Sequence, residues 1–252
     1  MRIVPMLLVM AIAWSAMGQA NRPMFEVASI KRSTGDGFPD AKPRRSGDRV
    51  TMHNIRVATA IIYAYHLADG ALTTSHQLAG NLQMPSGWDE YDIDAIAPGA
   101  PSDDDLRLMF QVLLEERFKL QYRWESRELP LYDLTLAKNG SKLKTGDQNR
   151  KGTANRRSTE PEPGVSRLRG SGSIEDLVFA LSARLESPVR NLTGLTGGWY
   201  DLDVPFARDI TETTAATNLV TAVEEELGLK LKRSKGPVKV LVVVQVQRPT
   251  EN

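Results

Sequence analysis

Four aspartates at matching places in the two halves of the chain are the residues whose type and spacing could do chemistry. Asp92 and Asp94 alternate with apolar residues in one strand-like run, and Asp201 and Asp203 do the same in a second run. Because side chains alternate between the faces of a strand, each pair shares one face. Two carboxylates that flank one bond are what glycoside hydrolysis requires. The alternative is that the carboxylates lie in water and their equivalence is structural.

Aromatic residues beside these aspartates suggest a binding site rather than a catalytic one. Aromatic faces at the ends of strands can stack on sugars or hold peptide side chains. Packing in the core is the alternative role for them. The candidate ligand-binding residues are the aromatic and acidic residues of the two matching stretches: Trp88, Tyr91, Asp94, Trp199, Tyr200 and Asp203.

No other motif supplies catalytic residues, a metal site or a cofactor site. The three histidines, His53, His66 and His76, lie in no H-E-x-x-H pattern, and the sequence has neither a G-x-S-x-G elbow nor a phosphate-binding loop. The absence of cysteine excludes disulfides and thiolate chemistry. A net charge of +1 gives no general attraction to nucleic acid. We therefore expect no catalytic residue, no metal and no cofactor.

The first twenty residues have the pattern of a secretory signal peptide. Arg2 supplies the positive start, an apolar run covers 3–17, and 18–20 provide small residues for cleavage after Ala20. An uncleaved N-terminal anchor is the alternative. The sequence thus predicts an exported protein, periplasmic or extracellular, with no membrane span after cleavage.

The rest of the chain divides into two halves with the same order of expected elements. The predicted fold class is α+β or mixed α/β, built from two diverged β-α-β-α-β-β units with mixed sheets. The first unit covers 21–143 and has an extra N-terminal strand, a polar basic linker or long loop covers 144–164, and the second unit covers 165–252. Whether the units form one pseudo-symmetric domain or two lobes is left open.

Local signals set the ends of the expected helices. Ser102 and Ser173 each precede a helix and have an aspartate three residues on, which is typical of a capping box. Asn54 is the expected N-cap of an earlier buried helix, and Thr213 or Thr214 is the expected start of the last one.

Each unit is expected to close with an antiparallel hairpin. In the first unit a turn at 125–128 divides residues 119–137 into two strands. In the second unit the turn signal Gly236-Pro237 divides residues 229–246. The final strand is apolar on both faces, so we expect it to be central in its sheet.

Six stretches carry a pattern shared with a known family: Phe25–Lys31, Tyr91–Ala95, Leu113–Leu120, Glu128–Tyr132, Thr193–Asp201 and Glu226–Leu231. By these motifs the chain resembles a large uncharacterised family of exported soil-bacterial proteins, abundant in acidobacteria and known as a domain of unknown function. The resemblance implies no established activity. Some related domains are joined to membrane metallopeptidases of the antibiotic-sensor type, which implies an extracytoplasmic sensing or interaction role.

Two features separate this chain from those relatives. It has no peptidase motif, and Val244-Gln245 stands where members often have an Asp-His pair. The leading hypothesis is a non-catalytic module of the cell envelope that binds a ligand or a partner protein. A hydrolase using strand-borne aspartates is the alternative, and a purely structural envelope protein is a third reading.

Overall fold

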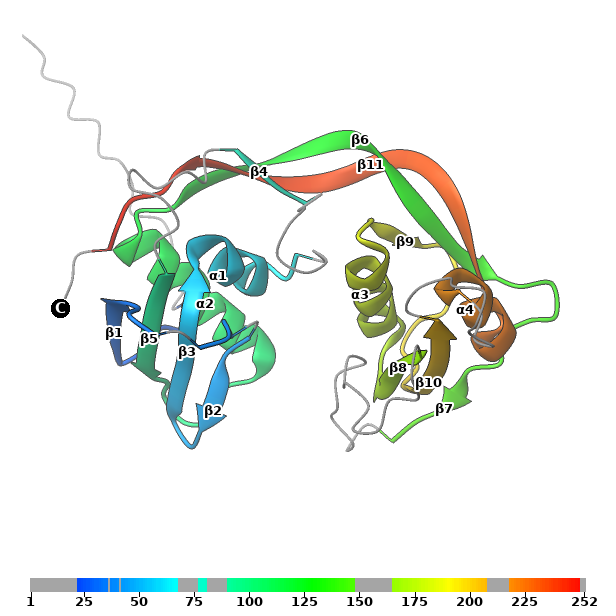
Figure 1. The fold of residues 1–252 in the computed structure, drawn as a ribbon, viewed down its shortest axis with the longest axis horizontal. Helices are drawn as coiled ribbons and strands as arrows, with labels where there is room; N and C mark the ends of the chain where they lie inside the picture. Colours follow the sequence, from blue (N-terminus) through cyan, green and yellow to red (C-terminus); the bar gives the residue numbers. More distant parts are fainter. Residues whose placement is uncertain are drawn as a thin grey trace, which may run out of the picture.

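The computed structural model describes residues 22–35, 37–40, 42–67, 77–80, 90–147, 165–207 and 218–249. Figure 1 shows that these residues form two lobes beneath a long ribbon of two strands. Four helices and eleven strands in mixed sheets make up the described part, which confirms the mixed α+β class. The predicted signal peptide and residues Thr213 and Thr214 lie outside the described residues.

The helices are α1 (Val57–Ala64), α2 (Asp103–Arg117), α3 (Ile174–Leu185) and α4 (Leu219–Leu227). The strands are β1 (Val27–Arg32), β2 (Arg44–Ser46), β3 (Arg49–Arg56), β4 (Leu78–Gly80), β5 (Glu90–Ile96), β6 (Gln121–Leu136), β7 (Lys144–Thr145), β8 (Val165–Gly172), β9 (Val189–Asn191), β10 (Tyr200–Ala207) and β11 (Leu229–Gln245).

The first lobe is an antiparallel sheet with strand order β1-β5-β3-β2, packed against α1 and α2. Strand β5 alternates as expected, because Tyr91, Ile93 and Ala95 are buried while Asp92 and Asp94 remain partly exposed. Helix α2 begins at the predicted capping box: the Ser102 hydroxyl accepts a hydrogen bond from the backbone N–H three residues on, and the reciprocal bond is also made.

Asn54 does not cap α1 as predicted. The N-cap is Arg56, and Asn54 lies within β3 with a positive φ of 51° and 4 % exposure. Its side chain donates to the carbonyl of Gly37 (2.8 Å), and its backbone N–H donates to the Asp92 carboxylate (2.9 Å). Asparagine tolerates this left-handed conformation better than most residues, so it is used here to fix the loop that follows β1.

The second lobe is an antiparallel sheet with strand order β7-β10-β8, packed against α3 and α4. A capping box at Ser173 starts α3 as predicted. Helix α4 is capped by Asn218, whose side chain accepts from the N–H of Thr221 (3.0 Å). Lys144 and Thr145, the first residues of the predicted linker or long loop, form β7 and pair with β10, while residues 148–164 lie outside the described residues.

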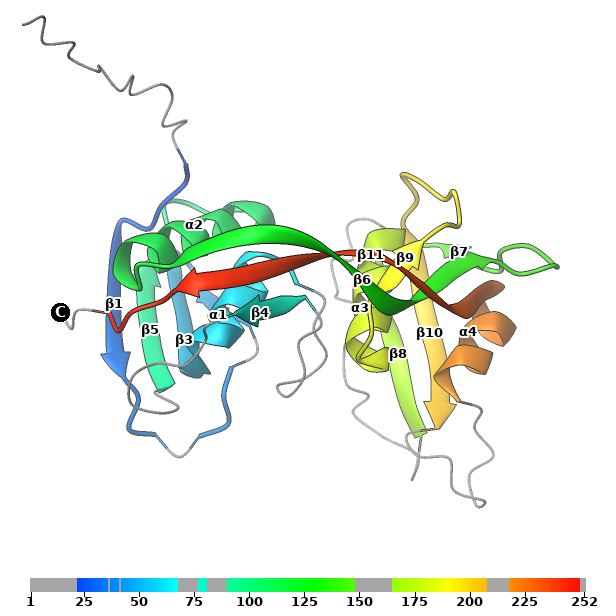
Figure 2. The same ribbon diagram turned by 90° about the horizontal axis from the view of Figure 1, so that it is seen from above.

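The two predicted hairpins are not formed. Residues 121–136 make one continuous strand, β6, and residues 229–245 make another, β11, and the two pair antiparallel along nearly their whole length. Figure 2 shows this ribbon running across both lobes. Strand β11 lies between β4 and β6, so its central position in the sheet is confirmed.

The hydrogen-bond pattern of the ribbon explains why its prolines do not break it. The N–H of Tyr132 points away from β11 and donates to the carbonyl of Pro188 (2.8 Å), and the N–H of Leu241 points away from β6. Because the direction of the N–H alternates along a strand, Pro130 and Pro237 also have their nitrogens on the outer edges. Neither proline removes a bond between β6 and β11.

Each strand of the ribbon contributes one of its ends to the lobe formed by the other half of the chain. Strand β4 of the first half pairs parallel with β11, and β9 of the second half pairs parallel with β6. Leu241 and Val243 of β11 belong to the first core, while Leu134 of β6 belongs to the second. Both halves have the order strand, helix, short strand, strand, helix, long strand. That they are diverged copies stays a prediction.

Candidate functional site

Of the four predicted aspartates, Asp94 and Asp203 are held in ion pairs on the sheets of the two lobes, and the Asp92 carboxylate accepts a hydrogen bond from the backbone N–H of Asn54. Asp94 on β5 accepts two hydrogen bonds from the guanidinium of Arg49, one of them 2.9 Å from Nε. Asp203 on β10 lies 2.9 Å from Arg167 and 3.1 Å from Arg169. Each aspartate thus neutralises arginines from the neighbouring strand, and the two belong to different sheets.

This pairing determines the charge of Asp94. Hydrogen bonding to Arg49 holds the pKa of the Asp94 carboxyl below its ordinary value. A general acid for glycoside hydrolysis needs the opposite change, a raised pKa that keeps the proton on near neutral pH. Asp94 is thus held as the ionised partner of Arg49 and lacks the raised pKa of such an acid.

The predicted aromatic residues have packing roles in the described structure. Tyr91 is buried, and its ring lies edge-on to that of Phe118, with centroids 5.4 Å apart. Tyr200 packs against the second core, and the indole N–H of Trp199 donates to the Ser171 hydroxyl (2.8 Å). Trp88 lies outside the described residues. The described candidates are divided between the lobes and do not meet in one site.

The histidines also have local partners. His53 contacts the buried carboxylate of Asp40 through Nδ1 (3.3 Å), and its backbone N–H donates to the same carboxylate (2.9 Å). The ring of His66 lies 4.5 Å from that of Phe179 on α3, so it connects the two lobes. His76 is outside the described residues. No group of acidic or histidine side chains within the described ranges could hold a metal ion.

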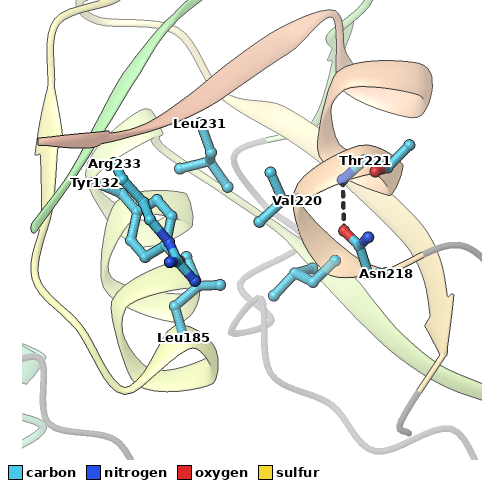
Figure 3. Close-up of a pocket in the computed structure, with 8 residues that line it drawn as sticks. Tyr132, Leu185, Asn218, Val220, Thr221, Leu231 and Arg233 are labelled. Atoms are coloured by element: carbon cyan, nitrogen blue, oxygen red, sulfur yellow. Dashed lines mark hydrogen bonds between the residues drawn. The ribbon is translucent and has the colours of Figure 1, made fainter. Parts of the chain in front are cut away.

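An open groove in the second lobe is the strongest candidate for a binding site. It has a volume of about 470 Å³ and lies between the ribbon and the first turn of α4 (Figure 3). The residues that line it come from four elements or their ends: Tyr132 on β6, Leu185 on α3, Asn218, Leu219, Val220 and Thr221 at the start of α4, and Leu231 and Arg233 on β11.

The groove combines an apolar surface with one cation. The side chains of Leu185, Val220 and Leu231 point into it, and Arg233 lies beside Tyr132 at its ribbon side (Figure 3). The guanidinium Nε of Arg233 donates to the Tyr132 hydroxyl (3.2 Å), which fixes the orientation of the guanidinium. No ion pair within the described part of the chain involves Arg233. An anionic group in the groove would meet this charge directly.

Further cations continue from the groove along the same face of β11. Residues 233, 235 and 239 share this face by alternation, and Arg233, Lys235 and Lys239 are all exposed. The ammonium of Lys239 lies 4.4 Å from the centre of the Trp124 ring on β6. The ribbon therefore presents positive charge on the face that also packs onto the two lobes.

Sequence reasoning missed the groove because its residues are far apart in the chain. One local signal was present in β11, where Leu229 and Leu231 are buried and Arg233 follows on the same face. Because we predicted a hairpin turn at Gly236-Pro237, Arg233 was assigned to a short strand beside that turn, and the signal was not recognised.

A model of the family described as "Protein of unknown function (DUF3738)" matches residues 58–246, which is most of the chain. This confirms the resemblance to an uncharacterised family, while the soil-bacterial origin and export stay predictions. No curated protein and no solved structure matches the chain. Among the helices that the structure describes, none is long and apolar enough to cross a membrane.

Proposed function

Because the chain belongs to the DUF3738 family, whose function is unknown, we propose a function from the site itself: the protein is a non-catalytic binding module. Its binding site is the groove between α4 and the ribbon. The pattern of residues 1–20 favours export, so the ligand is one met in the cell envelope or outside the cell.

The observation that carries the proposal is an open groove that is apolar with a single oriented cation. Its volume of about 470 Å³ lies within the range of about 300–1,000 Å³ for ligand pockets. Such pockets are mostly apolar and contain a few polar groups that set the orientation of the ligand. Arg233 and the side chain of Asn218 supply such groups here.

Catalysis at this groove has no support from its chemistry. The eight described lining residues include no acid, histidine or serine. Arginine stays protonated at any pH at which the protein is folded, so Arg233 is not a general base. Two of the aspartates that could support hydrolysis, Asp94 and Asp203, are ion-paired on the two sheets. Binding without turnover is therefore the function we propose for the groove.

A thermal-shift screen of the protein against glycans, peptidoglycan fragments, peptides and divalent metals tests the proposal. A ligand present at 100 times its Kd adds about 2.7 kcal/mol of stability, which raises Tm by roughly 5–10 °C for a protein of this size. We expect at least one class to give such a shift.

Two matched variants connect any shift to the groove. Val220→Trp fills the groove from its α4 side and should abolish the shift, while Val244→Trp changes an exposed valine of β11 in the other lobe and should retain it. Asp94→Asn and Asp203→Asn should also retain it. A shift that survives Val220→Trp, or no shift with any ligand, would refute the groove as the binding site.

A further inference from the structure

The pairing of the ribbon gives the groove a counterpart in the first lobe. Tyr132 pairs with Arg233 across the ribbon and with the first residue of β9 on its other side. In the first lobe, Leu241 of β11 likewise pairs with Trp124 of β6 on one side and with the first residue of β4 on the other. The two ends of the ribbon are thus related by a local two-fold arrangement. In this arrangement Arg233 takes the place of Trp124.

In the first lobe this place is filled by aromatic rings. Tyr65 follows the end of α1, and its ring centre lies 4.7 Å from that of Tyr122 and 6.3 Å from that of Trp124. The Tyr122 and Trp124 rings lie 6.4 Å apart. All three pairs have edge-to-face geometry, which aromatic rings prefer. The protein therefore closes this end of the ribbon with its own aromatic side chains.

In the second lobe smaller and charged residues take the corresponding places. Leu231 lies where Tyr122 lies in the first lobe, two residues before Arg233 on the same face. Leu185 ends α3, much as Tyr65 follows α1. Three rings are replaced by two leucines and an arginine, while the ring of Tyr132 takes the place of Leu241. With fewer rings, this end of the ribbon has the open groove.

The cations of the groove indicate that a ligand with an aromatic ring should also carry a carboxylate. Within the described residues, one of the five guanidinium N–H groups of Arg233 donates to Tyr132, which leaves four that could donate to a ligand. Lys235 is exposed two residues further along the same face, and no ion pair of either residue occurs in the described part of the chain. A carboxylate beside the ring would make charge-assisted hydrogen bonds there.

We propose that the groove binds a peptide segment that presents an aromatic side chain next to a carboxylate. The ring fills the space that aromatic residues occupy in the first lobe, and the carboxylate pairs with Arg233. This inference rests on the proposed function and defines its ligand. The occupant is a polypeptide because the exposed cations continue along the ribbon at strand spacing, which matches an extended acidic chain.

Titration calorimetry with three capped peptides tests the inference. The first is acetyl-Gly-Glu-Trp-Glu-Gly-amide; the second has glutamine for both glutamates, and the third has alanine for tryptophan. We expect the first to bind, and the second and third to bind at least tenfold more weakly, because each lacks one of the two recognised groups.

Variants of β11 assign the two parts of the recognition. Arg233→Gln should remove the preference for glutamate over glutamine, while Lys232→Gln, an exposed cation on the opposite face, should preserve it. Arg233→Trp copies the first-lobe residue into the groove and should abolish binding of all three peptides. Val220→Trp repeats that test from α4, and circular dichroism verifies that each variant is folded.

The outcomes separate this inference from the proposed function. Equal affinity for the three peptides overturns the aromatic–carboxylate ligand. Absence of peptide binding, together with a screening ligand whose shift disappears in Val220→Trp, overturns this ligand and leaves the groove as a binding site. If no compound of either experiment binds, both proposals fail.

Discussion

Proline placed at neighbouring positions of β11 distinguishes the continuous ribbon from the hairpin that its turn signal predicts. The outward N–H of Leu241 sets the alternation along the strand, so Lys235 has its N–H on the outer edge and Ser234 has its N–H directed at β6. Lys235→Pro should therefore be tolerated. Ser234→Pro should remove a bond to Leu131, the residue opposite it.

The cost of Ser234→Pro follows from the burial of its partner. Leu131 is only 3 % exposed, so its carbonyl would lose a hydrogen bond where water is scarce. An unsatisfied buried acceptor costs roughly 1–3 kcal/mol, so we expect a loss of about 2 kcal/mol. For a protein of this length that lowers Tm by roughly 4–8 °C. Lys235→Pro should cost at least about 1 kcal/mol less.

Urea denaturation followed by circular dichroism measures both variants against the parent protein. In a hairpin that turns at Gly236-Pro237, residues 234 and 235 would lie at the turn, and proline would be accepted at both. Equal stability of the two variants, or a larger loss for Lys235→Pro, would contradict the continuous strand and the outward alternation.

Three further predictions concern local structure and pH. Gly228→Ala should destabilise the protein by more than about 1 kcal/mol in urea denaturation, because φ is +63° and the new Cβ would lie 2.2 Å from the carbonyl oxygen of Gly140. Ser102→Ala should cost about 1 kcal/mol by the same assay, since it removes the cap of α2. Burial lowers the pKa of His66 beside Phe179, so the folded state binds its proton less readily than the unfolded state. Stability should thus fall as pH drops below about 6.5, and His66→Leu should weaken that fall in melting curves taken between pH 8 and 5.

The parts of the fold that the sequence predicted are those decided by near neighbours. The capping boxes at Ser102 and Ser173 need only a hydroxyl and a carboxylate three residues apart. The alternation of β5 needs only its own pattern of apolar and acidic residues. Each of these signals acts within one turn or one strand, so distant residues do not override it.

The hairpin predictions were wrong because pairing with residues far away in the chain decides whether these segments turn or stay extended. Gly236 and Pro237 are typical turn residues, yet they pair with Leu129 and Glu128, residues of the other half of the chain. A proline whose nitrogen lies on an outer edge is compatible with a strand, and that edge is known only once the partner is known. The local pattern contained no information about that partner.

The same contrast between local and long-range information applies to the candidate site. Sequence reasoning found the aspartates and aromatics near β5 and β10 because the two stretches have similar sequence patterns. The structure gives Asp94 and Asp203 ion pairs and Tyr91 a packing contact. The groove depends on Tyr132 and Arg233 meeting across the ribbon, about a hundred residues apart in the chain. Tyr132 is not notable in its own segment, and the local signal at Arg233 does not reveal its partner.

The exchange of strand ends also affects how a nascent chain acquires its structure. A chain that has emerged only through β6 holds α1 and α2 but lacks Leu241 and Val243, which complete the first core. The apolar surface that these residues cover should stay accessible to chaperones until β11 arrives. Long-range pairing of this kind also slows folding. The two lobes should consequently mature together, and neither half of the chain should be a stable fragment when expressed alone.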